Sequence, residues 1–217
     1  PSKIIEVKQE VDSIYFYTDN SVILKLTVLR DSLIRFRFTT KGYFSNDFSY
    51  AIDATQSHGY NFLELKEEKT FYTITTSKVI CTIQKDDLRV SISSIDGLHI
   101  LDDELGFHWE ESYEFGGNIV KMSKASKDGE SYYGLGDKAS HLNLKGKRVE
   151  NFATDQYAFS KDQEPLYKVV PFYIGLFLCI LYKLFVGLNY REEVLNFFYP
   201  IPNIIEFIAI IFNQIVY

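Results

Sequence analysis

The residues whose types and spacing could do chemistry lie mainly within residues 130–172. In that stretch the run 151–155, NFATD, ends in the carboxylate of Asp155, and Tyr157 and Phe159 follow two and four residues later. A carboxylate can accept hydrogen bonds from two adjacent hydroxyl groups, and such charge-assisted bonds are stronger than neutral ones. Aromatic side chains nearby could supply an apolar platform against which a ligand ring packs. The alternative for Asp155 is structural, because Asx residues commonly cap turns.

Signals for a metal or nucleotide site are missing from the sequence. The two cysteines, Cys81 and Cys179, are far apart, the four histidines are scattered, and there is no CxxC or HExxH pattern. A zinc site is therefore not expected. The segment 133–136, YGLG, could form a tight turn between strands, but it lacks the GxGxxG pattern of a dinucleotide site. We predict no metal and no cofactor.

The elements that must position these residues are predicted to be short strands. Residues 33–38, LIRFRF, alternate with a period of two, so that Arg35 and Arg37 share one face and the apolar side chains share the other. Further runs of strand length, rich in β-branched and aromatic residues, are 22–29, 71–76, 79–83 and 88–92. Asp86-Asp87 and Asp96-Gly97 are turn residues between them. This density of strands predicts an all-β fold, an antiparallel β-sandwich.

Two segments do not follow the alternating pattern. Residues 106–127 are polar and poorly periodic, and we predict irregular strands and loops there. After Gly175 the composition changes abruptly: residues 172–188 and 201–217 are almost wholly apolar. A basic cluster at residues 145–148, KGKR, is too short for a nucleic-acid footprint in a chain of net charge −6, so it is predicted to be a solvated hairpin tip.

Three motifs in order carry a family resemblance. They are residues 130–138 (ESYYGLGDK), 151–155 (NFATD) and 165–172 (PLYKVVPF), with a glycine hairpin at 144–147 between the first two. In this order the chain resembles glycoside hydrolase family 31, the α-glucosidase and α-xylosidase family. The resemblance implies that residues 1–176 are the galactose-mutarotase-like N-terminal β-sandwich of such an enzyme. It also implies a parent that hydrolyses α-glucoside oligosaccharides without metal or cofactor.

The resemblance also assigns roles within the loop. It implies that the loop of Asp155 helps to form a glucose-binding pocket, with Tyr157 and Phe159 as substrate-binding neighbours. Phe152 stands where the family usually has Trp, a conservative change. Two other acids of the loop, Asp162 and Glu164, are expected to be solvated.

No catalytic residue is predicted in this chain. A retaining glycosidase needs two carboxyl groups about 5–5.5 Å apart, and in this family both belong to a barrel of about 250 residues. Only 42 residues follow Gly175, and their acids, Glu192, Glu193 and Glu206, match neither catalytic motif. The chain by itself is therefore expected to be inactive.

Residues 177–217 form an apolar tail with three competing explanations. The tail could result from a frame slip or truncation near Leu176, or it could be a pair of membrane segments of marginal length. It could also be an apolar helix or strand pair docked on the sandwich. Contact with a membrane is expected only through this tail.

Two further expectations concern the cellular compartment and the alternative functions of the protein. If Pro1 is the true start, the lack of a secretory signal predicts a cytoplasmic protein. Two alternative functions remain open at this stage: a stand-alone carbohydrate-binding β-sandwich, and a membrane-tethered interaction protein built on the tail. Neither alternative involves nucleic acid.

Overall fold

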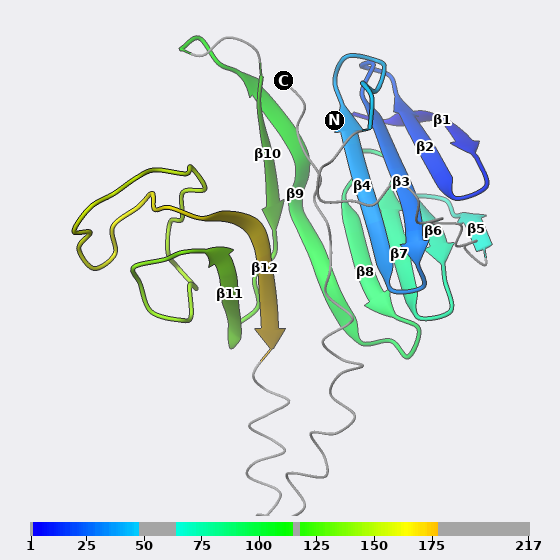
Figure 1. The fold of residues 1–217 in the computed structure, drawn as a ribbon. Coiled ribbons are helices and arrows are strands. Elements are labelled where there is room, and N and C mark those ends of the chain that lie inside the picture. The colour runs from blue at the N-terminus through cyan, green and yellow to red at the C-terminus, as the bar shows by residue number, and fades with distance from the viewer. Residues whose placement is uncertain (1, 48–63, 115–117, 178–217) are drawn as a thin grey trace, which may run out of the picture. The chain divides into compact units, whose positions relative to one another are not determined.

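The described part of the chain is all-β. The computed structural model describes residues 2–47, 64–114 and 118–177, and these ranges contain twelve strands and no helix. They form two compact units, the first reaching to Ala125 and the second beginning at Ser126 (Figure 1).

The first unit contains two antiparallel sheets. The four-stranded sheet is a meander in chain order, formed by β1 (Ile4–Gln9), β2 (Ser13–Thr18), β3 (Ile23–Arg30) and β4 (Leu33–Thr39). The six-stranded sheet has the order β10-β9-β8-β7-β6-β5, formed by β5 (Glu64–Glu67), β6 (Phe71–Thr75), β7 (Val79–Gln84), β8 (Val90–Ser94), β9 (His99–Glu111) and β10 (Asn118–Lys124). Every neighbouring pair of strands is antiparallel and follows in sequence, so each sheet needs only short connections.

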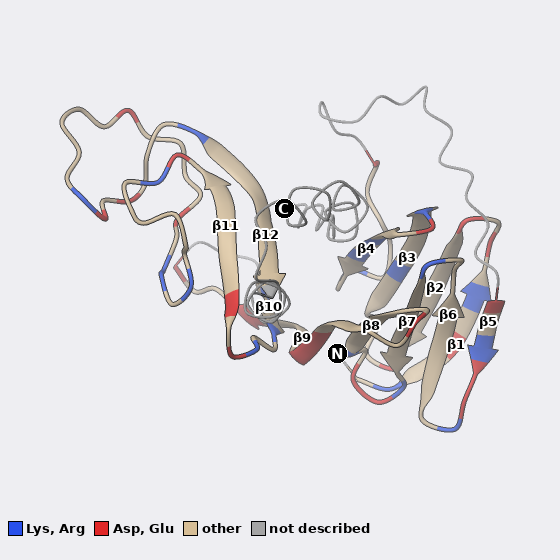
Figure 2. Ribbon diagram, turned by 90° about the horizontal axis from the view of Figure 1, so that it is seen from below, with Lys and Arg blue, Asp and Glu red and all other residues tan. Residues whose placement is uncertain are grey.

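The core lies between these two sheets. Every second residue of β2, β3, β7 and β8 is buried, and in β4 Ile34 and Phe36 are buried. The largest fully buried side chains come from both layers: Phe16, Ile14, Leu24, Leu26, Ile74 and Ile83. Complete burial of such a side chain contributes about 1.5–3 kcal/mol. Strands β6 to β8 carry no charged residue and are tan in Figure 2.

Direct contacts hold the layers together. The ring centroids of Phe16 and Tyr72 are 5.6 Å apart, and the hydroxyl of Thr76 donates to the Asp31 carbonyl oxygen at 2.6 Å. Between the same two sheets, Phe38 of β4 stacks on Phe107 of β9, with ring centroids 5.2 Å apart. The predicted antiparallel β-sandwich is therefore confirmed.

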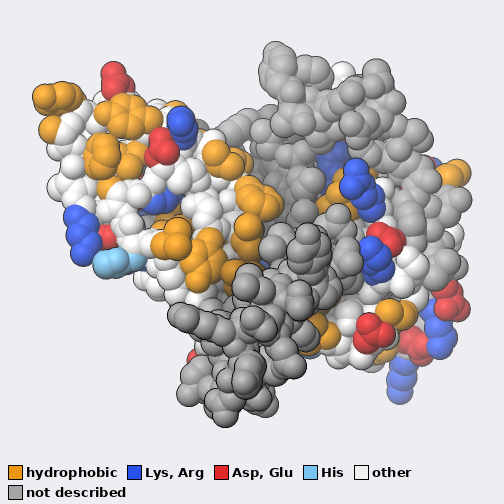
Figure 3. Space-filling model, turned by 60° about the horizontal axis from the view of Figure 1, so that its bottom comes forward, with side chains coloured by type: hydrophobic (Ala, Val, Ile, Leu, Met, Phe, Trp, Pro, Cys, Tyr) orange, Lys and Arg blue, Asp and Glu red, His pale blue; other side chains and the backbone are white. Residues whose placement is uncertain are grey.

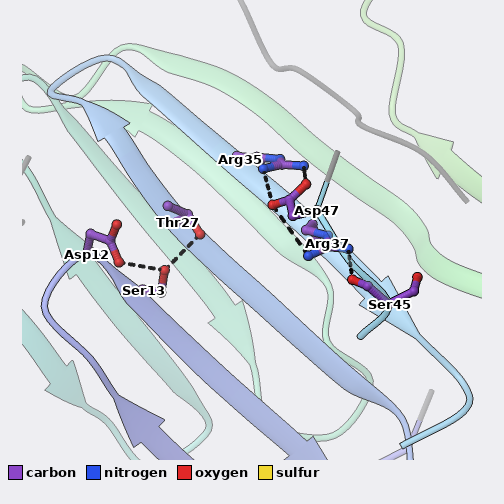
Figure 4. A network of polar contacts seen from close by, with 7 residues as sticks. All are labelled: Asp12, Ser13, Thr27, Arg35, Arg37, Ser45 and Asp47. Atoms are coloured by element: carbon purple, nitrogen blue, oxygen red, sulfur yellow. Dashed lines mark hydrogen bonds and ion pairs between the residues drawn. The ribbon is translucent and has the colours of Figure 1, made fainter. Parts of the chain in front are cut away.

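The alternation predicted for residues 33–38 is also confirmed. Ile34 and Phe36 are buried, whereas Arg35 and Arg37 lie on the outer face of β4. Both guanidinium groups contact Asp47, which receives two hydrogen bonds of 2.7 Å from Arg35 (Figure 4). Arg37 also donates to the Ser45 carbonyl oxygen at 3.2 Å. The segment after β4 is thus held against the outer face of the sheet.

The structure corrects two predictions of local structure. Residues 106–127 contain longer strands than predicted, because β9 runs on to Glu111 and pairs with β10 from Asn118↔Glu111 to Ser123↔Gly106. A bulge interrupts the alternation near Gly106, which leaves Leu105 exposed and Phe107 buried. The strand predicted from residue 88 begins only at Val90.

Leu88 explains the second error. It is fully buried but has a φ of 59°, and its N–H donates to the Gln84 carbonyl oxygen at 3.2 Å, so it belongs to the turn after β7. The turns predicted at Asp86-Asp87 and Asp96-Gly97 are present, and Gly97 has a φ of 85°. The aliphatic side chain of Leu88 therefore indicates a buried position in a turn and not a strand.

Candidate functional site

The frame of the candidate site is the two-stranded sheet of the second unit. Strand β11 (Glu130–Gly136) pairs antiparallel with β12 (Val169–Phe177), from Glu130↔Phe177 to Gly136↔Val169. Strand β12 contains the end of the third motif, residues 169–172. A two-stranded sheet is marginal by itself, so the 32-residue connection between the strands must supply further packing.

The two glycines of the YGLG segment do not form a tight turn between strands. Gly134 and Gly136 lie within β11, where the register shifts around Leu135. A Cβ at Gly134 would lie 2.6 Å from the Phe172 carbonyl oxygen, and one at Gly136 would lie 2.4 Å from the Lys168 carbonyl oxygen. Their φ angles are 112° and 84°, which L side chains rarely adopt. Glycine is therefore required because the two backbones approach closely at a bulge.

The connection, residues 137–168, has no regular secondary structure but is tied by specific contacts. Leu144 and Leu166 are buried within it, and the Leu144 N–H donates to the Tyr132 carbonyl oxygen at 2.8 Å. The Thr154 N–H donates to the Leu166 carbonyl oxygen at 3.1 Å. The predicted glycine hairpin is a turn at Lys145-Gly146 with exposed side chains.

Asp155 lies on the surface of this connection. Its side chain is exposed, and within the described part of the chain its carboxylate makes no hydrogen bond or ion pair. Within the described residues no backbone N–H donates to this carboxylate, as an Asx cap of a turn would require. An unpaired surface carboxylate keeps its acceptor positions available for a ligand.

The two predicted aromatic neighbours differ in their surroundings. Tyr157 is 90% exposed, while Phe159 is half exposed and meets Tyr167 edge to face, with ring centroids 6.4 Å apart. The Tyr167 hydroxyl donates to the Gln156 carbonyl oxygen. No hydrogen bond or ring contact joins Asp155 to either aromatic residue in the described ranges. Their substrate-binding role stays a prediction.

Two other acids of the connection, Glu164 and Asp162, are bound to lysines. Lys138 Nζ lies 3.0 Å from Glu164 Oε2, and the two side chains are only 7% and 17% exposed. Asp162 accepts from Ser140 Oγ at 2.7 Å and from Lys147 Nζ at 3.0 Å. These two hydrogen bonds lower the pKa of the Asp162 carboxyl group. Glu164 is not solvated as predicted, because it forms a largely buried ion pair.

Lys138 and Tyr167 were not singled out from the sequence. Both belong to the matching motifs, Lys138 ending the YGLGDK run and Tyr167 standing in PLYK. Their contacts reach 26 and 11 residues along the chain. Spacing in the sequence gave no indication of either contact.

The surface around the site is rich in exposed apolar groups. Figure 3 shows hydrophobic side chains gathered over the second unit, at the left of that view. The exposed residues of this unit include Leu142, Phe152, Tyr157, Phe159, Tyr167 and Phe172. Such a surface is unusual for a solvated face and is typical of an interaction or ligand surface.

Metal and membrane sites were also sought in the described ranges. Residues 2–47, 64–114 and 118–177 hold no group of three or more His, Cys, Asp or Glu side chains placed to bind a metal ion. They also contain no helix with the length and hydropathy of a bilayer span. Strand β12 ends at Phe177, the first residue of the apolar tail, and residues 178–217 lie outside the described residues.

Comparison with known protein families identifies the family of this chain. Residues 23–178 match the profile described as the glycosyl hydrolase 31 N-terminal galactose mutarotase-like domain. The chain belongs to this family. The matched range covers β3 to β12, including the whole connection that carries Asp155, so the predicted family and fold class are both confirmed.

Individual relatives of this family are distant and much longer. Alpha-glucosidase 2 of Bacillus thermoamyloliquefaciens is 24% identical over 161 residues, which are 73% of this chain and 19% of that protein. A family 31 dextranase of Flavobacterium johnsoniae, solved with isomaltotriose, has a TM-score of 0.70 at 20% identity and is matched over 80% of this chain and 21% of that chain. The family 31 alpha-xylosidase of Xanthomonas citri has a TM-score of 0.62 at 20% identity, over 77% of this chain and 18% of that one. The chain therefore spans about a fifth of the length of these relatives.

Proposed function

We propose that this chain is the N-terminal domain of an α-glucosidase-like glycoside hydrolase. In this proposal the complete polypeptide hydrolyses O-glycosyl bonds of α-glucosides, and the connection between β11 and β12 contributes Asp155, Tyr157 and Phe159 to the substrate-binding pocket. The catalytic carboxyl groups would belong to a part of the polypeptide beyond these residues.

The observation that supports the proposal most is the match of residues 23–178 to a domain family of glycoside hydrolases. The relatives matched include an alpha-glucosidase, and a dextranase solved with isomaltotriose. The exposed and unpaired carboxylate of Asp155 supports the site within the domain. It could accept hydrogen bonds from two adjacent sugar hydroxyls, which are stronger than bonds between neutral groups.

The test is an activity assay on the complete polypeptide encoded by the gene. Release of glucose from maltose, isomaltotriose and 4-nitrophenyl α-glucoside would be measured for the wild type, for Asp155→Ala and for Asp128→Ala. Asp128 is a matched control, because it is an exposed acid of the same unit that lies outside the connection. Loss of hydrogen bonds to a charged group, worth about 1.5–3 kcal/mol, should lower kcat/KM about 10- to 100-fold in Asp155→Ala.

Two results would contradict the proposal. The first is that the complete polypeptide releases no sugar from any α-glycoside, and the second is that Asp155→Ala and Asp128→Ala are equally active. Binding of maltose by an inactive polypeptide, abolished in Asp155→Ala, would instead indicate a stand-alone carbohydrate-binding β-sandwich.

A further inference from the structure

A single lysine closes the loop that carries all three predicted site residues. The Lys138 ammonium group donates to the Glu150 carbonyl oxygen at 3.2 Å and to Glu164 Oε2 at 3.0 Å. Glu150 and Glu164 are the two ends of a 15-residue segment that contains Asp155. Both ends therefore meet at one nitrogen, which is the arrangement of a compact Ω-type loop.

Burial makes this closure more than a surface contact. The Lys138 side chain is 7% exposed and the Glu164 side chain is 17% exposed. An exposed ion pair contributes little, but removing one partner of a buried pair leaves a charge without compensation. Lys138 is the second residue after β11, and the N–H of the preceding Asp137 donates to the Lys168 carbonyl oxygen at 3.3 Å, which ties this backbone to the residue before β12.

In the outer part of the same loop, the side chains of Asp155 and Tyr157 are not held by hydrogen bonds of their own in the part of the chain that the structure describes. Asp155 and Tyr157 are exposed, and within the described residues neither side chain has a hydrogen bond. The neighbours of Asp155 are tied to the residues that follow Glu164: the Thr154 N–H donates to the Leu166 carbonyl oxygen, and the Tyr167 hydroxyl donates to the Gln156 carbonyl oxygen. A displacement of Glu164 would therefore be carried through Leu166 and Tyr167 to the Asp155 carboxylate.

We infer that Lys138 is a positioning residue, whose ammonium group holds the loop 150–164 closed and thereby fixes the place of Asp155 for substrate binding. This inference rests on the proposed function. Lys138 itself does not contact the substrate in this account. It acts through the Glu150 carbonyl group and the Glu164 carboxylate.

The first arm of the test needs no substrate. Hydrogen–deuterium exchange of the backbone amides of residues 150–164 would be compared in the wild type, Lys138→Met, Glu164→Gln and Lys161→Met. Lys161→Met is the matched control, because it removes one positive charge from an exposed position of the same loop. We expect exchange to accelerate about tenfold or more in Lys138→Met, less in Glu164→Gln, which keeps an acceptor oxygen, and not in Lys161→Met. The exchange of β11 and β12 reports whether the second unit of each variant folds, and the exchange of β2 and β3 reports the same for the first unit.

The second arm uses the complete polypeptide and asks whether Lys138 acts through Asp155. Misplacement of a binding group by about 1 Å can lower the rate about 10²-fold, so kcat/KM should fall in Lys138→Met and stay unchanged in Lys161→Met. In an Asp155→Ala background, Lys138→Met should have little additional effect, because the group that it positions is already missing. Additive losses would overturn the positioning role.

The two arms separate the failure of this inference from that of the proposed function. Unchanged exchange of residues 150–164 in Lys138→Met overturns the closure, whatever the activity. Accelerated exchange in a polypeptide that cleaves no α-glycoside leaves Lys138 as the closing residue but overturns both its role in substrate binding and the proposed function.

Discussion

Gly136→Ala tests the close approach of β11 and β12 that frames the candidate site. A Cβ at this position would lie 2.4 Å from the Lys168 carbonyl oxygen and 3.0 Å from the Val170 nitrogen. Both contacts are with backbone atoms, so no side-chain rotation can relieve them. The two strands would have to separate at the point where the connection begins.

The expected magnitude combines two costs. A positive φ costs an L-residue about 1–2 kcal/mol, and forcing an extra methyl group into a packed site costs about 1–3 kcal/mol. Gly129 provides the control, because its φ is 81°, close to the 84° of Gly136, and nothing lies within 4 Å of its added Cβ. Gly129→Ala should therefore cost about 1 kcal/mol, and Gly136→Ala about 3 kcal/mol.

Hydrogen–deuterium exchange of the β11 and β12 amides measures this difference within the second unit. A gap of about 2 kcal/mol between the two variants corresponds to about a 30-fold difference in the opening equilibrium. The strands of the first unit should exchange as in the wild type in both variants. Equal exchange of β11 and β12 in Gly129→Ala and Gly136→Ala would refute the argument that backbone contact, rather than φ alone, requires the glycine.

Three further predictions concern the first unit. The hydrogen bond from Arg35 is the main cause that lowers the pKa of Asp47 in the folded protein. The ionised Asp47 therefore stabilises the fold above its unfolded pKa of about 4, and this stabilisation is lost as the pH falls through its pKa in the folded protein. Since the Asp47 side chain is 45% exposed, Asp47→Asn should cost only about 1 kcal/mol near neutral pH, and the difference in urea midpoint should disappear in acid; a midpoint difference that is constant with pH would contradict this. Burial raises the pKa of the Cys81 thiol, so iodoacetamide should label it only after denaturation, and rapid labelling of native protein, seen by peptide mass spectrometry, would be inconsistent with the core. Phe16 is fully buried against Tyr72, so Phe16→Ala should lower the free energy of unfolding by about 3–5 kcal/mol; a loss below that of Asp47→Asn in urea unfolding would be evidence against the sandwich core.

Much of the first unit could be predicted from the sequence because its signals are local. The alternation of Ile34 and Phe36 with Arg35 and Arg37 defines both a strand and its buried face, since side chains point to opposite faces with a period of two. The turn at Asp96-Gly97 likewise depends on the residues that form it. Local signals failed where a bulge broke the period at Gly106 and where Leu88 was apolar because of its burial in a turn.

For the candidate site too, some properties follow from the sequence and others only from the tertiary structure. The sequence by itself determined the family, through the order of its motifs, and pointed to Asp155, Tyr157 and Phe159. Only the tertiary structure decided that Asp155 has no partner in the described residues, and that Lys138 joins Glu150 and Glu164 across 12 and 26 residues.

The two glycines of YGLG show why the sequence alone could not predict such contacts. In the sequence they indicate a turn, but in the structure they lie in a strand beside Lys168 and Phe172, more than 30 residues away. A residue's own type limits its φ and its polarity. Which backbone passes beside it depends on how the whole chain folds, and no local pattern encodes that.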